Sequence, residues 1–158
     1  MQQPQWISSR RFALPGNRDD GEYTAEKETQ VGHALKKAAG VLIVEDDFLI
    51  GMQTESALAD AGIYVVGIAS TAEEAVVLAR QYKPVLAVMD IRLAGQRDGV
   101  DAAGELFREL GVRCIFATAH DDQRTRSRAE PFAPLGWLAK PYTMASLIAL
   151  VRQAIAAG

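Results

Sequence analysis

Short runs of consecutive apolar residues recur through the second part of the chain. Within each run the apolar residues occupy successive positions rather than alternate ones. This pattern is typical of strands that are covered on both faces of a parallel sheet. The runs span residues 41–44, 63–69, 85–90, 112–118 and 135–139. We therefore predict five buried parallel strands.

Stretches with helical periodicity separate these runs. Thr71 and Glu74 have the spacing of a capping box, and Asp98 and Thr143 stand where N-cap residues are expected. The stretches cover residues 49–62, 71–82, 99–110, 121–134 and 143–157. Five strands that alternate with five helical segments predict a doubly wound α/β fold, in which right-handed crossovers place helices on both faces of the sheet.

The helical stretch at 121–134 differs from the others. It has almost no apolar residue before Phe132, and Pro131 interrupts it. We expect a short, loosely held helix that ends before Pro131 and has no specified buried face. Acidic residues lie beside its three arginines, so we interpret these as a solvated helix face rather than a nucleic-acid site. The arginines are Arg124, Arg126 and Arg128.

Residues 1–39 are mostly polar and contain too few large apolar side chains to build a second core. Residues 24–39 have a thin apolar face, composed mostly of alanine, which favours at best a marginal helix. We predict an extension over 1–39, partly disordered or helical, followed by one domain over 40–158. The sequence ends soon after the last predicted helix, so we expect a single-domain protein whose output is a protein contact.

Composition narrows the class of protein. The 158 residues are 49% apolar and 23% charged, with a net charge of −3, which indicates a soluble globular domain without a strong attraction to nucleic acid or anionic membranes. No apolar run approaches the roughly 18 residues of a membrane span, and no secretory signal is present. Cys114 is the single cysteine. We expect it to be a small buried hydrophobe in a cytoplasmic protein.

The ends of the predicted strands carry the candidate chemistry. Parallel strands present their carboxyl ends at one edge of the sheet, where ligands bind in such folds. Carboxylates that share a small site need a cation or a proton between them, and an all-oxygen set suits Mg²⁺. A carboxylate beside Mg²⁺, a lysine and a hydroxyl can accept a phosphoryl group as an aspartyl phosphate. The residues at these ends are Glu45, Asp46, Asp47, Asp90, Thr118 and Lys140.

At this point the chain resembles the receiver domain of two-component response regulators, across residues 40–157. The motifs that carry the resemblance are VLIVEDD at 41–47, VMDIRL at 88–93, FATA at 116–119 and LAKP at 138–141. The resemblance implies a flavodoxin-like sheet with the strand order 2-1-3-4-5. It also implies a phosphoprotein of two-component signalling or a phosphorelay.

The resemblance assigns a role to each residue of the cluster. Asp90 is the phosphoryl acceptor and Lys140 the phosphate-binding lysine. Thr118 is the switch hydroxyl and Trp137 the switch aromatic residue, while Asp47 begins the first helix. The implied Mg²⁺ ligands are Glu45, Asp46, Asp90 and the backbone carbonyl of Arg92.

Arg92 and His120 follow the acceptor and the switch hydroxyl by two residues each, which in receivers are positions that flank the path of the attacking water. We expect them to set the lifetime of the aspartyl phosphate, either by shielding the phosphoryl group or by orienting the water. The motif FATAHD at 116–121 and the apolar-poor fourth helix also resemble a subgroup called FATGUY receivers, although the subgroup reads FATGY there.

The leading hypothesis is a single-domain response regulator that accepts a phosphoryl group from a sensor histidine kinase or a phosphotransfer protein. It then signals to a downstream protein partner or as a homodimer, without nucleic-acid or membrane contacts. We expect no enzymatic activity beyond acceptance and hydrolysis of its own phosphoryl group. The alternatives are a receiver fold used only for docking, which would not need the acidic set, and a metal-dependent phosphatase, whose Asp-x-Asp loop is absent after Asp90.

Overall fold

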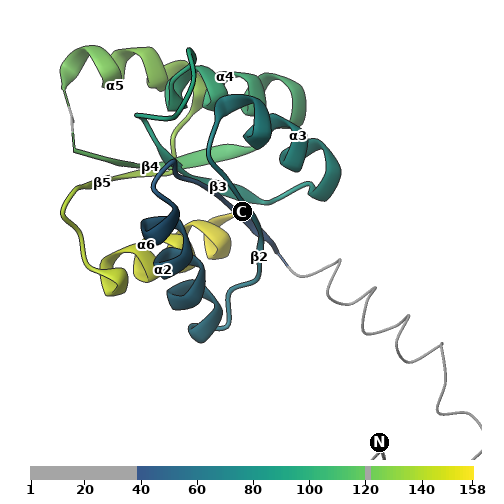
Figure 1. Ribbon diagram of the computed structural model, residues 1–158, viewed down its shortest axis with the longest axis vertical. Helices are drawn as coiled ribbons and strands as arrows, with labels where there is room; N and C mark the ends of the chain where they lie inside the picture. Colours follow the sequence, from purple (N-terminus) through teal and green to yellow (C-terminus); the bar gives the residue numbers. More distant parts are fainter. Residues whose placement is uncertain (1–38, 120–121) are drawn as a thin grey trace, which may run out of the picture. The chain divides into compact units, whose positions relative to one another are not determined.

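The computed structural model describes residues 39–119 and 122–158. Over these residues the chain forms a parallel five-stranded sheet in the order β2-β1-β3-β4-β5 (Figure 1). The strands are β1 (Val41–Val44), β2 (Val65–Ala69), β3 (Leu86–Asp90), β4 (Arg113–Thr118) and β5 (Gly136–Ala139). The predicted strands and their order are confirmed. The predicted extension lies, except for Ala39, outside the described residues.

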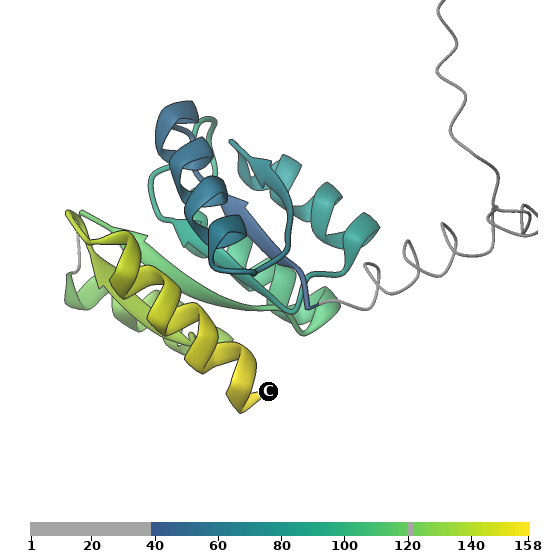
Figure 2. The same ribbon diagram turned by 90° about the horizontal axis from the view of Figure 1, so that it is seen from below.

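Helices cover both faces of this sheet (Figure 1; Figure 2). They are α2 (Phe48–Asp60), α3 (Ala72–Tyr82), α4 (Gly99–Leu110), α5 (Gln123–Ala129) and α6 (Met144–Ala157), with a short 3₁₀ helix, η1 (Glu130–Phe132). Helices α3, α4 and α5 lie on one face, and α2 and α6 on the other. None of the helices in the described part of the chain is long and apolar enough to cross a membrane.

The alternation of side chains along β1 explains the two-faced core. Leu42 and Val44 pack among the residues of α3 and α4, whereas Val41 and Ile43 pack against Leu58 of α2 and the inner face of α6. Successive strand residues point to opposite faces, so a continuous apolar run supplies both cores at once. Cys114 is buried in β4, and this burial raises the pKa of its thiol to about 12.

Side-chain caps fix where the helices begin. Asp47 accepts hydrogen bonds from the backbone N–H groups of Leu49 and Ile50, so it is the N-cap of α2 as predicted. Asp98 and Thr143 cap α4 and α6. Asp98 forms a reciprocal capping box with Asp101.

One detail of α3 corrects the sequence prediction. Thr71 accepts from the N–H of Glu74 at 3.1 Å, which is half of the expected capping box. The Glu74 carboxylate, however, accepts from the N–H and the hydroxyl of Ser70, at 2.7 and 2.8 Å. The acid therefore pairs with the residue before the cap, whose backbone N–H and hydroxyl both donate to it.

Helix α5 ends at Ala129, before Pro131, as predicted, and most of its residues are exposed. Ala129 is fully buried, and two arginines attach the helix to its neighbours. Arg128 forms ion pairs with Asp98 at 2.7 Å and Asp101 at 3.2 Å, and the Arg126 guanidinium lies 4.7 Å from the centre of the Trp137 ring. Apolar periodicity does not predict these polar contacts. How loosely the segment is held stays a prediction.

Candidate functional site

The predicted site residues lie at the carboxyl edge of the sheet. They end or follow four different strands of the parallel sheet, so the fold brings together residues that are far apart in the sequence. They are Glu45 and Asp46 after β1, Asp90 at the end of β3, Thr118 at the end of β4 and Lys140 after β5. The Asp47 side chain instead caps the N-terminus of α2.

Three carboxylates form the acidic part of the site. Glu45, Asp46 and Asp90 each offer an oxygen, and these oxygens all lie within 4.8 Å of one another. Glu45 and Asp90 are 6% and 8% exposed, whereas Asp46 is exposed. This donor set fits Mg²⁺, which prefers oxygen ligands and retains water on its accessible side.

Lys140 joins the two buried acids. Its Nζ donates to Oε2 of Glu45 at 2.9 Å and to Oδ2 of Asp90 at 2.8 Å. One ammonium thereby offsets part of the repulsion between two carboxylates that are nearly removed from water. The geometry places the lysine in direct contact with Glu45 and with the predicted acceptor Asp90.

The electrostatics of this contact follow from burial and pairing. Burial raises the pKa of Glu45, against the lowering effect of hydrogen bonds from Lys140 and from the Asp47 N–H. Burial by itself lowers the pKa of Lys140, but hydrogen bonds to Asp90 and Glu45 outweigh it, so the net shift is upward. Lys140 therefore stays protonated throughout the physiological pH range.

The backbone fixes the Asp90 side chain from the other side. The backbone N–H of Arg92 donates to Oδ1 of Asp90, with 3.3 Å between nitrogen and oxygen. The backbone N–H of Gly99 donates to the carbonyl oxygen of Ile91 at 2.7 Å. Gly99 lies so close to the backbone of Asp90 that a Cβ there would overlap the Asp90 carbonyl oxygen. The role of the Arg92 carbonyl as a metal ligand stays a prediction.

The two predicted switch residues occupy neighbouring strands. Thr118 is 1% exposed at the end of β4. Trp137 pairs in register with Phe116, and their rings stack with centroids 4.7 Å apart and planes inclined by 23°. The Arg126 guanidinium lies over the Trp137 ring, so this side chain has an aromatic and a cationic neighbour. The switch roles of Thr118 and Trp137 stay predictions.

Some residues at the site were missed or fall outside the description. His120 lies outside the described residues, and Arg92 is exposed. That these two residues set the lifetime of the aspartyl phosphate stays a prediction. Tyr142 was not predicted. Burial raises its pKa, and its hydroxyl hydrogen-bonds with Thr54 near the charges of the site. Gly99 was also missed, although a glycine directly after the N-cap Asp98 is a visible signal of a close backbone approach.

Comparisons with known proteins agree with this geometry. Residues 41–152 match the family model of the response regulator receiver domain. The transcriptional regulatory protein PdtaR of Mycobacterium tuberculosis is 35% identical over 115 residues, which is 73% of this chain and 56% of PdtaR. The phyllosphere-induced regulator PhyR of Methylorubrum extorquens is 37% identical over 124 residues, which is 77% of this chain and 45% of PhyR. The chain thus spans about half the length of these relatives.

A solved structure extends the likeness to three dimensions. The signal receiver domain of a modulated diguanylate cyclase from Desulfovibrio desulfuricans superposes with a TM-score of 0.69 at 37% identity, covering 75% of this chain and 94% of that one. The family match includes β1, β3, β4 and β5, whose ends carry the acids, the hydroxyl and the lysine. The chain therefore belongs to the response regulator receiver domain family.

Proposed function

We propose that this protein is a single-domain response regulator that accepts a phosphoryl group on Asp90. The observation that carries this proposal is the placement of the Asp90 carboxylate, which is nearly buried and lies 2.8 Å from Lys140 beside Glu45 and Asp46. A carboxylate in this setting is presented to a phosphorus atom with positive charge already at hand.

The transfer is a substitution at phosphorus. A carboxylate oxygen of Asp90 forms the new O–P bond while the bond from phosphorus to the donor breaks, and the donor leaves with its electron pair. With a histidine kinase or a phosphotransfer protein as donor, the bond that breaks is P–N and the leaving group is the histidine imidazole, which takes up a proton. The product is an aspartyl phosphate.

Residues of the chain orient the acceptor and neutralise charge. Lys140 is already hydrogen-bonded to Asp90, and its ammonium group has a further N–H that can donate to the phosphoryl oxygens. The Arg92 N–H steadies the other oxygen of the acceptor. Mg²⁺ held by Glu45, Asp46 and Asp90 supplies further neutralisation of the phosphoryl oxygens when bound.

The phosphorylated state is read by a partner and ends by hydrolysis. Hydrolysis of the aspartyl phosphate returns inorganic phosphate, so the protein transforms no substrate besides its own phosphoryl group and is not an enzyme in the usual sense. The hydroxyl of Thr118 senses the phosphoryl oxygens, and the signal passes to a downstream protein or a second copy of the chain. We propose that this exchange takes place in the cytoplasm.

Labelling with acetyl phosphate and Mg²⁺, read by intact mass and Phos-tag electrophoresis, tests the proposal. The wild-type chain should gain one phosphoryl group, and Asp90→Asn should gain none while keeping its circular dichroism spectrum. Asp60→Asn changes an exposed aspartate at the end of α2 and should label like the wild type. Labelling of Asp90→Asn at the wild-type level, or no labelling of the wild type, would contradict the proposal and, in the second case, favour a docking module.

A further inference from the structure

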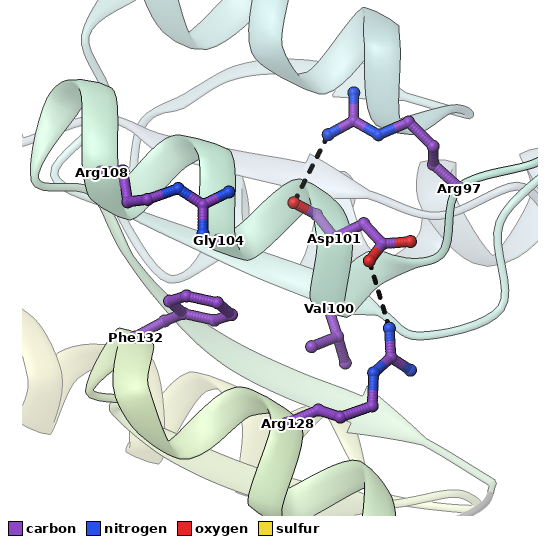
Figure 3. A pocket seen from close by; sticks show the side chains of 7 residues that line it. All are labelled: Arg97, Val100, Asp101, Gly104, Arg108, Arg128 and Phe132. Carbon is purple, nitrogen blue, oxygen red and sulfur yellow. Dashed lines mark hydrogen bonds and ion pairs between the residues drawn. The ribbon is translucent and has the colours of Figure 1, made fainter.

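A cavity of about 320 Å³ lies between α4 and the segment formed by α5 and η1, and it shares no residue with the acidic site (Figure 3). For comparison, a dry cavity of about 150 Å³ is large enough to bind benzene. The cavity is lined by Arg97, Val100, Asp101, Gly104, Arg108, Arg128 and Phe132. It therefore has room for a small planar ligand.

Four of the seven residues that line the cavity are charged, and its apolar groups come from Val100, Gly104 and Phe132. Val100 is 2% exposed and lies one helical turn before Gly104 on α4. Gly104 leaves space for the ring of Phe132, because a Cβ at that position would come within 2.7 Å of Cζ of the ring. Figure 3 shows the Phe132 ring and the Val100 side chain turned toward the same space. An aromatic ring placed there would contact the partly exposed ring of Phe132.

The three arginines of the rim are not equivalent. Arg97 donates to Glu105 at 2.6 Å, and Arg128 is bound to Asp98 and Asp101. Arg108 has no carboxylate partner within the described ranges 39–119 and 122–158, and its guanidinium carbon lies 5.3 Å from the centre of the Phe132 ring. A guanidinium stacked on a ring keeps its N–H edge available for an anion.

The charges of the rim also limit what can bind. Asp101 lines the cavity, so a second negative charge on a ligand would meet a carboxylate as well as Arg108. A single anionic group on a flat apolar body matches both the partly exposed Phe132 ring and the one guanidinium without a carboxylate partner among the described rim residues. We propose that this cavity binds a small aromatic monocarboxylate, with its ring against Phe132 and its carboxylate on Arg108. The proposal does not depend on phosphoryl transfer.

Benzoate and its neutral isostere benzamide test the proposal on the full-length protein. Titrations are followed by two-dimensional amide NMR spectra. Benzoate should produce saturable shifts centred on Val100, Gly104 and Phe132, and benzamide should bind about tenfold more weakly because it lacks the charge. Occupancy bridges α4 and η1, so benzoate should also raise the thermal midpoint.

Arg108→Gln is the decisive variant, and because Arg108 is exposed we expect the substitution to leave the fold intact, which its circular dichroism spectrum checks. It should reduce benzoate affinity about tenfold, to the level of benzamide. Arg124→Gln removes an exposed arginine of α5 that does not line the cavity, and it should bind benzoate like the wild type. Shifts that stay linear with benzoate concentration, equal binding of benzamide, or unchanged affinity in Arg108→Gln would each overturn the proposal.

Discussion

Gly99 and Asp90 are in direct backbone contact: the α-carbon of Gly99 faces the Asp90 carbonyl so closely that no Cβ fits between them. Gly99 is also the first residue of α4, directly after the N-cap Asp98. The start of α4 is therefore pressed against the residue that we propose as the phosphoryl acceptor. This contact links the acceptor to the helix that Arg128 ties to α5.

We expect Gly99→Ala to lower the free energy of unfolding by about 2 kcal/mol, because the methyl group must displace backbone rather than a flexible side chain. Urea denaturation measures this. Gly67→Ala is the matched control, since its Cβ would meet Leu78 at an ordinary 3.4 Å. It should change the stability by less than about 1 kcal/mol. Equal effects of the two substitutions would refute the close contact.

Asp46→Asn should weaken Mg²⁺ binding by about an order of magnitude, because a neutral amide replaces one carboxylate of an all-oxygen set. Isothermal titration calorimetry measures the affinity without any phosphodonor. Asp46 is exposed, so the substitution should leave the fold unchanged. Asp60→Asn should bind Mg²⁺ as the wild type does. Wild-type affinity in Asp46→Asn would remove that residue from the metal site.

Arg128→Gln should reduce stability at pH 7 by about 1 kcal/mol, a modest figure because Arg128 and Asp98 are 41% and 33% exposed. Partial burial raises the pKa of Asp98, but hydrogen bonds from Arg128 and from the Asp101 backbone outweigh it and lower the pKa below 3.8. A lowered pKa in the folded state means that the stabilisation is present above pH 3.8. It is lost as the pH falls through the lowered value.

The difference in unfolding free energy between wild type and Arg128→Gln should therefore stay constant from pH 7 to about pH 5 and shrink below pH 3.8. Chemical denaturation across this range measures it. Arg124→Gln, on the same helix, should not separate from wild type at any pH. A difference that grows toward acid pH would show that Asp98 is not the partner that matters.

Trp137 should report the activated state. In a Trp6→Phe background it is the only tryptophan of the sequence. Beryllofluoride with Mg²⁺ mimics the phosphoryl group, and movement of Thr118 toward it should disturb the Trp137 ring between Phe116 and Arg126. We expect a change in emission together with altered hydrogen exchange in α5. If neither signal moves while beryllofluoride binds, the switch does not run through Trp137.

The sequence allowed the sheet, its helices and the edge that carries the acids to be predicted, because apolar runs and strand-end residues follow simple periodic rules. It did not reveal how α5 is attached. Arg126 and Arg128 read as solvent-facing, since a pair between Arg128 and Asp98 joins positions 30 residues apart and leaves no local pattern. The contact of Gly99 with Asp90 has one local sign, the glycine directly after the N-cap Asp98, but the sequence does not show that the partner is Asp90, because the contact arises only when α4 folds back on β3.

Because Cys114 is buried, the reactivity of its thiol reports when the folded structure opens. A thiol with a pKa of about 12, buried in β4, presents almost no thiolate at neutral pH and no path for an alkylating reagent. Cys114 packs in the core that α3, α4 and α5 cover, so its thiol becomes reactive only when the elements over that face of the sheet open. The rate at which a thiol reagent consumes the one cysteine of the sequence thus measures the opening of this core. A cysteine introduced on the surface would therefore be the thiol that reacts while the domain stays folded, because Cys114 would not.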